Sequence, residues 1–323
     1  MSSGASPPLP TVLVLRWLTP TFDAVLSARF NLLKSYESPL SRDAFLASPA
    51  AASASAAIVS GGGAVDAALL DLLPNLRCVV TTSAGVNHID FAECARRGVA
   101  VANAGTVYSV DVADYAVGLL LDVLRRVSES ERFLRGGLWP IKGEYPLGYK
   151  LGGKRVGIVG LGSIGSEIAK RLEAFCCIIS YLSRRPKPNV SYKYFSNICD
   201  LAAECDILVV SCALNSETRH IINKDVMQSL GRDGVIINVG RGALIDEEEL
   251  VHHLMQGELG GAGLDVFENE PFVPKELFSM DNVVLAPHLA VHTPESFSGL
   301  LQLIIENLEA FFSNKPLITQ VFE

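Results

Sequence analysis

Short apolar runs alternate with amphipathic segments along most of the chain, a pattern typical of α/β proteins. In the first third, the pattern predicts strands at 12–15, 57–60, 78–82 and 99–102, and helices at 22–30, 65–73 and 89–97. In the second half it predicts strands at 155–159, 177–182, 206–210, 234–239, 263–267 and 282–286. These runs are almost continuously apolar, so we expect parallel sheets with helices covering both faces.

Two longer segments have helical periodicity. An apolar stripe from Val112 to Val123 predicts one helix over 111–135, well placed to bridge two domains. A second stripe predicts a helix over 297–312 that returns to cover the first domain, because no strand follows it. The Ala/Ser-rich stretch 47–57 is predicted to be a helix end followed by a loop.

A glycine-rich turn lies between the two halves of the chain. It follows the strand at 155–159, precedes an amphipathic helix, and reads Gly160, Leu161, Gly162, Ser163, Ile164 and Gly165. The first glycine allows the tight turn, the second leaves room for a pyrophosphate, and the third lets helix and strand pack closely. The helix N-terminus adds amide groups that bind an anion. The context therefore predicts a dinucleotide site.

The end of the next strand points to the kind of dinucleotide. An NAD site usually has Asp or Glu there to accept a hydrogen bond from the ribose 2′-hydroxyl. This chain has Ser183, Arg184 and Arg185 instead, and two guanidinium groups suit the 2′-phosphate of NADP(H). We therefore expect NADP(H), with NAD(H) as a weaker alternative. A basic loop that is merely solvated remains the other interpretation.

Composition narrows the class of protein. The 323 residues are 49% hydrophobic and 19% charged, enough for two globular cores. A net charge of −8 argues against nucleic acid or an anionic membrane as the main partner. No apolar run reaches the length of a membrane span. Neither segment 1–10 nor segment 320–323 is typical of a secretory or peroxisomal signal.

The cysteines indicate a compartment. They number seven, at irregular spacing and without a C-x-x-C pair, so we expect no disulfide framework and no metal site. This usage fits a reducing compartment, and we expect a cytoplasmic protein.

Three polar residues follow predicted strands in the second half. Arg241 follows the strand at 234–239, Glu270 comes shortly after 263–267, and His288 follows 282–286. Functional side chains gather at the carboxyl ends of strands in open α/β sheets. Singly, each residue has an ordinary explanation as a loop cation, a solvated turn residue or a strand-end histidine. Together they form a coherent catalytic set.

The order of Arg, Glu and His after a mid-chain glycine turn resembles the D-isomer-specific 2-hydroxyacid dehydrogenases, in particular the plant hydroxypyruvate and hydroxyphenylpyruvate reductases. The similarity extends over nearly the whole chain, through motifs at 81–90, 111–114, 156–165, 238–242, 263–271 and 286–288. It implies an α/β fold of two Rossmann-like parallel-sheet domains. A cofactor domain, residues 105–288, would be inserted into a flavodoxin-like substrate domain formed by 1–104 and 289–323.

The resemblance also implies an activity. The expected reaction is NADPH-dependent reduction of hydroxypyruvate, glyoxylate or 4-hydroxyphenylpyruvate to the D-2-hydroxy acid, which is glycolate when glyoxylate is the substrate. A homodimer through the cofactor domain is implied as well.

The resemblance assigns roles to individual residues. Arg241 would hold the substrate carboxylate and polarise the carbonyl, and His288 would protonate the developing alkoxide. Glu270 would accept a hydrogen bond from the other imidazole nitrogen and favour the charged ring. The substrate carboxylate would bind backbone amides around Ser83, Ala84 and Gly85. Besides the glycine turn, the cofactor would contact Ser183, Arg184, Arg185, Cys212, Ala213, Val239, Gly240 and Asp265, with Asp265 bonding the nicotinamide amide.

Two alternatives stay open at this point. Nicotinamide-sensing corepressors resemble this fold and keep the same residues, whereas a formate dehydrogenase relative is disfavoured by Glu270. Adjacent His252 and His253 are expected to be solvated on a polar helix. Four aromatic residues are candidate pocket walls, although a plain core role is the simpler expectation, namely Trp17, Tyr108, Trp139 and Phe272.

Overall fold

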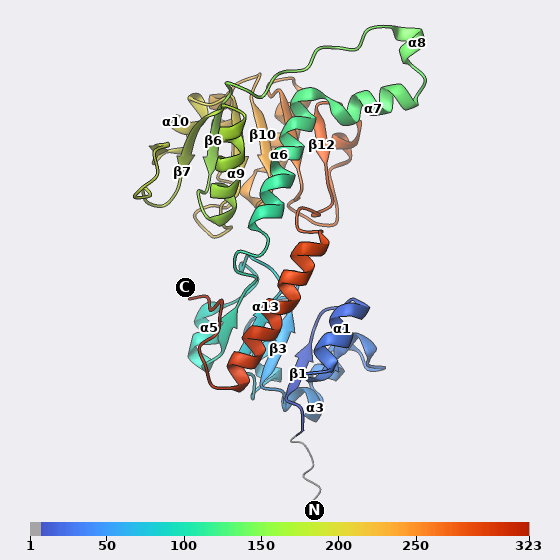
Figure 1. Cartoon of the computed structure of the whole chain (residues 1–323), viewed down its shortest axis with the longest axis vertical. Helices are drawn as coiled ribbons and strands as arrows, with labels where there is room; N and C mark the ends of the chain where they lie inside the picture. The colour runs from blue at the N-terminus through green and yellow to red at the C-terminus, as the bar shows by residue number, and fades with distance from the viewer. Residues whose placement is uncertain (1–7, 323) are drawn as a thin grey trace, which may run out of the picture. The chain divides into compact units, whose positions relative to one another are not determined.

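The structure is a computed structural model that describes residues 8–322. Residues 1–7 and Glu323, which belong to the terminal segments considered for targeting signals, lie outside the described residues. The chain forms two compact units, which are described separately (Figure 1). Unit 1 comprises Met1–Val107 with Pro294–Glu323, and unit 2 comprises Tyr108–Thr293. These boundaries lie a few residues from those expected from the sequence.

Unit 1 is built on a parallel five-stranded sheet with the order β2-β1-β3-β4-β5. The strands are β1 (Thr11–Val14), β2 (Asn31–Lys34), β3 (Ala56–Val59), β4 (Cys78–Thr81) and β5 (Ala100–Ala102). The helices are α1 (Pro20–Ser27), η1 (Ser35–Glu37), α2 (Arg42–Leu46), α3 (Pro49–Ala52), α4 (Ala67–Leu72), α5 (Phe91–Arg97) and α13 (Pro294–Phe312). Every residue of β3 and β4 is buried, as their continuous apolar runs require.

The C-terminal segment completes unit 1. Helix α13 contacts β4 and buries Leu300, Ile304 and Leu308. The fully buried Asn307 donates from Nδ2 to Thr319 Oγ1 at 3.2 Å, and Thr319 Oγ1 donates to the carbonyl of Asn103 at 2.7 Å. These bonds tie the chain after α13 to the end of β5.

Unit 2 is built on a parallel seven-stranded sheet with the order β12-β11-β10-β9-β6-β7-β8. Its strands are β6 (Arg155–Val159), β7 (Ile178–Leu182), β8 (Lys193–Phe195), β9 (Ile207–Val210), β10 (Val235–Asn238), β11 (Gly261–Leu264) and β12 (Val283–Leu285). Its helices are α6 (Ser109–Arg125), α7 (Val127–Arg135), α8 (Trp139–Lys142), α9 (Ser163–Ala174), α10 (Ile198–Ala203), α11 (Lys224–Leu230), η2 (Gly242–Leu244), α12 (Glu247–Met255) and η3 (Lys275–Ser279).

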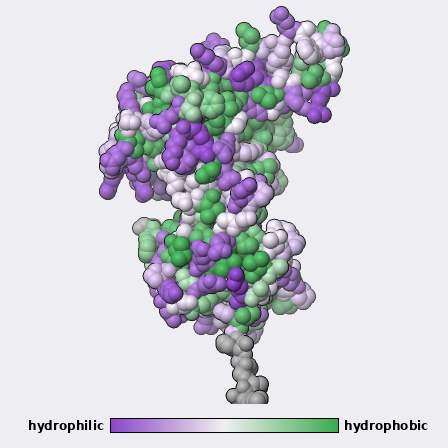
Figure 2. Space-filling view, viewed as in Figure 1, coloured by the Kyte–Doolittle hydropathy of each residue, from purple (hydrophilic) through white to green (hydrophobic). Residues whose placement is uncertain are grey.

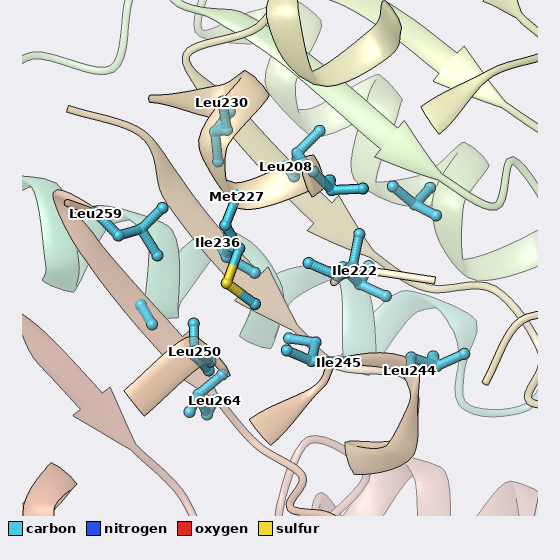
Figure 3. Close-up of a cluster of buried hydrophobic side chains, with 14 of the residues drawn as sticks. Leu208, Ile222, Met227, Leu230, Ile236, Leu244, Ile245, Leu250, Leu259 and Leu264 are labelled. Atoms are coloured by element: carbon cyan, nitrogen blue, oxygen red, sulfur yellow. The ribbon is translucent and has the colours of Figure 1, made fainter. Parts of the chain in front are cut away.

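Strands β9, β10 and β11 pack against α11 and α12 through a large apolar cluster. Figure 3 shows Ile236 and Met227 near its centre, with Leu208, Ile222 and Leu250 around them. The surface of each unit mixes polar and apolar residues on the face shown in Figure 2. The central strands of this sheet place their carboxyl ends on one edge, where the candidate site lies.

Some sequence expectations were wrong in detail. The helix expected over 111–135 is two helices, α6 and α7, because Arg126 adopts a left-handed conformation with φ 56°. Asp122 then accepts hydrogen bonds from the amide and hydroxyl of Ser128, which holds the break. The strand expected over 263–267 ends at Leu264. Strands β2 and β8 were not predicted, and α3 occupies part of the stretch expected to end in a loop.

The expectation of two solvated histidines holds only for His252. His253 is 1% exposed, because Leu250, His253 and Leu254 share the buried face of α12. Its Nδ1 lies 2.8 Å from the carbonyl of Glu249. The exposed His252 lies on the other side of the helix.

Among the described residues, no helix is long and apolar enough to cross a membrane, and no group of His, Cys, Asp or Glu has the arrangement of a metal site. All seven cysteines lie within 8–322 and none forms a disulfide. Burial raises the pKa of Cys78 and of Cys205 to about 12.

Candidate functional site

The glycine turn joins β6 to α9 with the geometry of a dinucleotide site. Gly160 has φ 100°, and a Cβ on it would lie 2.5 Å from Cα of Cys212, so no other residue fits. A Cβ on Gly165 would lie 2.1 Å from the carbonyl oxygen of Gly160, which shows how closely α9 approaches the strand end. Leu161 is buried beneath the turn.

The same turn leaves space and donors for a phosphate group. A Cβ on Gly162 would meet no atom within 4 Å, so this side of the turn is open. Gly162 is the N-cap of the twelve-residue α9, and Ser163 and Ile164 belong to its first turn. The positive end of the helix dipole and the free amides of the first turn therefore lie at this point. The residues present therefore fit a dinucleotide cofactor.

Other predicted cofactor residues follow neighbouring strands. Cys212 and Ala213 lie after β9, and Val239 and Gly240 lie after β10. A Cβ on Gly240 would lie 3.3 Å from the carbonyl oxygen of Cys212, so these two loops are in contact. Burial raises the pKa of Cys212 to about 11, so the thiol is neutral near pH 7. Unit 2 thus gathers these residues at one edge of its sheet.

The loop after β7 presents two exposed arginines. Ser183 Oγ donates to the carbonyl of Arg185 at 2.6 Å and shapes the turn. Arg184 and Arg185 are exposed, and neither forms an ion pair with a residue in the described range 8–322. The loop therefore carries two positive charges that no carboxylate of this chain neutralises.

His288 and Glu270 form a hydrogen-bonded pair. Nδ1 of His288 lies 2.9 Å from Oε2 of Glu270, and the side chains are 42% and 37% exposed. The other carboxylate oxygen of Glu270 accepts a hydrogen bond from the amide of Phe267 at 3.1 Å. Burial alone would raise the pKa of Glu270, but the bonds from His288 and Phe267 and the charges of His288 and Arg241 together lower it. Glu270 is therefore a carboxylate at neutral pH, and Nε2 of His288 is left for another partner.

Asp265 holds the loop that carries His288, a role not predicted from the sequence. Its carbonyl accepts the amide of His288 at 2.8 Å, while Oδ1 and Oδ2 accept the amides of Leu289 and Ala290 at 2.7 and 3.1 Å. Asp265 is 1% exposed, and burial raises its pKa in spite of these bonds. His288 itself has φ 56°, a left-handed conformation that this set of bonds supports.

Arg241 follows β10 in a turn that Asn238 stabilises. Nδ2 of Asn238 donates to the carbonyl of Arg241 at 2.9 Å, and Oδ1 of Asn238 accepts the amide of Gly240 at 3.0 Å. The guanidinium donates to the carbonyl of Gly240 at 2.7 Å. Burial lowers the pKa of Arg241 and the charge of Glu270 opposes this, but a guanidinium stays charged in proteins. The sequence signal for Asn238 was an Asn two residues before a Gly at a strand end.

The predicted carboxylate-binding turn, Ser83, Ala84 and Gly85, lies in unit 1 after β4. The fold holds its three carbonyl oxygens: Ser83 O accepts Ala104 N at 3.0 Å, and Ala84 O accepts Asn103 Nδ2 at 2.7 Å. Gly85 O accepts the hydroxyl of Ser83 at 2.7 Å. The amides of Ala84 and Gly85 donate to no acceptor within residues 8–322. Adjacent free amides of this kind form a binding site for an anion.

A core role was expected for the four aromatic candidates, and only one of them has it. Trp17 and Trp139 are each 62% exposed and Phe272 is 78% exposed, so a core role was wrong for these three. Tyr108 is 6% exposed and does belong to a core. Exposed tryptophan is uncommon on the surface of a monomer.

Comparison with known proteins places the chain in a family. Residues 117–290 match the family described as D-isomer specific 2-hydroxyacid dehydrogenase, NAD binding domain. The chain is 52% identical to a glyoxylate/hydroxypyruvate reductase of Arabidopsis thaliana, covering 99% of each chain. It is 47% identical to a hydroxyphenylpyruvate reductase of Plectranthus scutellarioides, covering 96% of this chain and 98% of the other.

Solved structures of similar proteins lead to the same family. An NADPH-dependent glyoxylate/hydroxypyruvate reductase of Sinorhizobium meliloti, in complex with NADP and malonate, is 38% identical with a TM-score of 0.90, over 97% of this chain and 96% of the other. A 2-hydroxyacid dehydrogenase of Ketogulonicigenium vulgare is 36% identical with a TM-score of 0.91, over 98% and 99%.

Proposed function

Because the chain belongs to the D-isomer specific 2-hydroxyacid dehydrogenase family, we propose that it reduces hydroxypyruvate, glyoxylate or 4-hydroxyphenylpyruvate to the D-2-hydroxy acid, with glycolate as the product from glyoxylate. The protein is an oxidoreductase that uses a nicotinamide cofactor. The two plant relatives are reductases, so the corepressor-like alternative has no support. Unit 2 would bind the cofactor and unit 1 the substrate.

The observation that carries the proposal is the His288–Glu270 pair. Glu270 accepts from Nδ1, which leaves Nε2 of His288 to donate a proton to the substrate oxygen. Glu270 is a carboxylate, and its hydrogen bond to Nδ1 fixes which ring nitrogen of His288 is left for the substrate. Asp265 fixes the loop and hence the direction of the ring.

Arg241 would bind the substrate carboxylate and the carbonyl oxygen with its forked donors. Its positive charge stabilises the negative charge that develops on the carbonyl oxygen during reduction. A reduced nicotinamide supplies the hydride when the cofactor is bound. The free amides of Ala84 and Gly85 are the second group that we assign to the substrate carboxylate.

The experiment that tests this proposal is a substrate panel. Purified protein is assayed at 340 nm with NADPH and NADH against hydroxypyruvate, glyoxylate and 4-hydroxyphenylpyruvate, and the product is analysed for chirality. We expect turnover of at least one acid and a D-configured product where the product is chiral. Absence of turnover with all three acids would contradict the proposal.

We propose further that NADPH is preferred. The two exposed arginines after β7 and the lack of a carboxylate at that strand end favour a 2′-phosphate over a free ribose hydroxyl. NAD(H) remains a weaker alternative cofactor.

Changing Arg184 and Arg185 together to Ala tests the cofactor preference. We expect the KM for NADPH to rise on the order of 10²-fold, because two charge-assisted contacts are lost. The KM for NADH should change little, since NADH carries no phosphate there, and it serves as the internal control. Equal use of both cofactors by the unmutated protein would show that the arginines do not select NADPH.

We also propose a homodimer through unit 2. Helices α7 and α8 project from the body of the unit (Figure 1). This arm, residues 127–149, exposes several large apolar side chains, namely Leu134, Trp139, Ile141, Leu147 and Tyr149. Ile141 is 78% and Leu147 92% exposed, which is unfavourable unless another surface covers them. A second copy of this chain is the partner that family membership implies.

Changing Trp139, Ile141 and Leu147 together to Ser should convert the dimer to a monomer, because the apolar area that drives association is removed. Light scattering coupled to size-exclusion chromatography measures the mass. A matched control is Phe322→Ser, since Phe322 is 76% exposed but belongs to unit 1. A triple variant that keeps the mass of an unmutated dimer would rule out the arm as the interface.

A cytoplasmic location also stays a proposal. The seven free cysteines support it, because paired cysteines are typical of oxidising compartments.

A further inference from the structure

A chain of side-chain hydrogen bonds runs through the loop after β4. Nε2 of His88 lies 3.1 Å from Oγ1 of Thr81, and this oxygen lies 2.9 Å from Oγ of Ser83. The hydroxyl of Ser83 donates to the carbonyl of Gly85 at 2.7 Å. Thr81 is fully buried, so its hydroxyl has no access to water. The chain therefore links a histidine directly to the turn that we assign to the substrate carboxylate.

The direction of each hydrogen bond in this series follows from the number of hydrogens that the side chains carry. Each hydroxyl carries one hydrogen, and that of Ser83 is used for the carbonyl of Gly85. Thr81 must then donate to Ser83, which uses the hydrogen of Thr81 as well. His88 is left to donate, so its Nε2 carries a proton. Chains in which every bond runs in one direction reinforce one another by polarisation.

The backbone around His88 is fixed independently. Its carbonyl accepts the amide of Val65 at 2.9 Å, and Asp90 N donates to the carbonyl of Val65 at 2.9 Å. Ile89, between them, is buried and forms a bridge with Val65. The loop thus holds the ring next to Thr81, and Thr81 is held by β4.

The series of hydrogen bonds from His88 closes the turn that carries the free amides of Ala84 and Gly85. In a trans peptide the N–H lies opposite the preceding carbonyl. Ala104 and Asn103 hold the carbonyls of Ser83 and Ala84, which fixes the amides of Ala84 and Gly85. The bond from the hydroxyl of Ser83 to the carbonyl of Gly85 spans the two peptides that carry these amides, so the closure of the turn depends on the hydrogen bonds from His88.

We propose that His88 is a positioning residue for 2-oxo acid binding, acting through Thr81 and Ser83 on the amides of the carboxylate-binding turn. The inference rests on the proposed function, because it takes the anion at this turn to be the substrate carboxylate. His88 does not exchange a proton with the substrate. It acts as a fixed donor.

Two matched pairs of variants test the inference. His88→Phe removes the donor, whereas His88→Gln keeps an amide donor at a similar reach. Thr81→Val removes the hydroxyl without changing shape, whereas Thr81→Ser keeps it. For His88→Phe and Thr81→Val we expect the KM for the oxo acid to rise about tenfold, with kcat within about threefold of the unmutated protein. His88→Gln and Thr81→Ser should restore most of the affinity, and the KM for NADPH should stay constant in all four.

A merely structural role would lower stability and impair NADPH and oxo acid kinetics together, so the separate KM values decide between the two. If the KM for the oxo acid stays within about twofold in both His88→Phe and Thr81→Val, the inference is overturned. Should a variant fail to fold, the unmutated protein still gives an answer. Its ¹⁵N spectrum must show His88 protonated at Nε2, and an Nδ1–H tautomer overturns the inference.

The ¹⁵N measurement also separates the two proposals. An unmutated protein that shows the Nε2–H tautomer but reduces no 2-oxo acid contradicts the proposed function and, with it, the assignment of the turn to the substrate. An active protein with the Nδ1–H tautomer keeps the proposed function and contradicts only the role of His88.

Discussion

Replacing His288 with glutamine is expected to lower kcat by about 10³-fold, because the variant cannot donate a full proton to the substrate oxygen. Glutamine keeps a hydrogen-bond donor of similar size, so the change isolates proton transfer from packing. Binding of NADPH, followed by quenching of protein fluorescence, should stay near that of the unmutated protein, since the glycine turn is elsewhere on the sheet edge.

The matched control for this variant is His252→Gln. His252 is exposed on α12 and has no part in the proposed chemistry, so its replacement should leave kcat unchanged. Turnover retained in the His288 variant would remove this histidine from the mechanism. Loss of NADPH binding alongside kcat would instead point to a collapsed loop.

Replacing Arg241 with lysine is expected to lower kcat/KM for the oxo acid by roughly 10²-fold. Lysine keeps the positive charge but loses the planar fork, so it cannot hold the carboxylate and the carbonyl oxygen at the same time. Loss of one strong charge-assisted hydrogen bond accounts for an effect of this size. Steady-state kinetics with saturating NADPH measure it.

Arg232→Lys is the matched control, because Arg232 is exposed on the same unit and follows α11 rather than a site strand. It should leave kcat/KM unchanged. An Arg241→Lys protein with ordinary kcat/KM would mean that charge alone suffices and that the forked contact does not exist.

The sequence predicted the strands that are buried on both faces but missed the edge strands β2 and β8, for a physical reason. Strands β3, β9 and β10 are buried on both faces and therefore appear as continuous apolar runs. Strands β2 and β8 lie at sheet edges and are only partly buried, so Asn31–Lys34 and Lys193–Phe195 carry no such run. The helix break at Arg126 could not be predicted, because no Gly or Pro marks it in the sequence. It depends on the hydrogen bonds of Asp122 with Ser128.

Some features of the candidate site could be predicted from the sequence, and others could not. Arg241, Glu270 and His288 could be predicted because each follows a strand closely in the sequence. The tether from Asp265 to Leu289 and Ala290 could not, because it joins residues far apart in the chain. The burial of His253 was within reach, since Leu250 and Leu254 stand three residues before and one after it on α12.

Unit 1 is made from both ends of the chain, and this affects the order in which the protein can fold as it is synthesised. The ribosome delivers residues 108–293, and so the whole of unit 2, before α13 exists. Until then, the face of unit 1 that Leu300, Ile304 and Leu308 cover is exposed to water. We expect unit 2 to fold first during translation and unit 1 to stay incomplete and prone to aggregation until the last helix emerges.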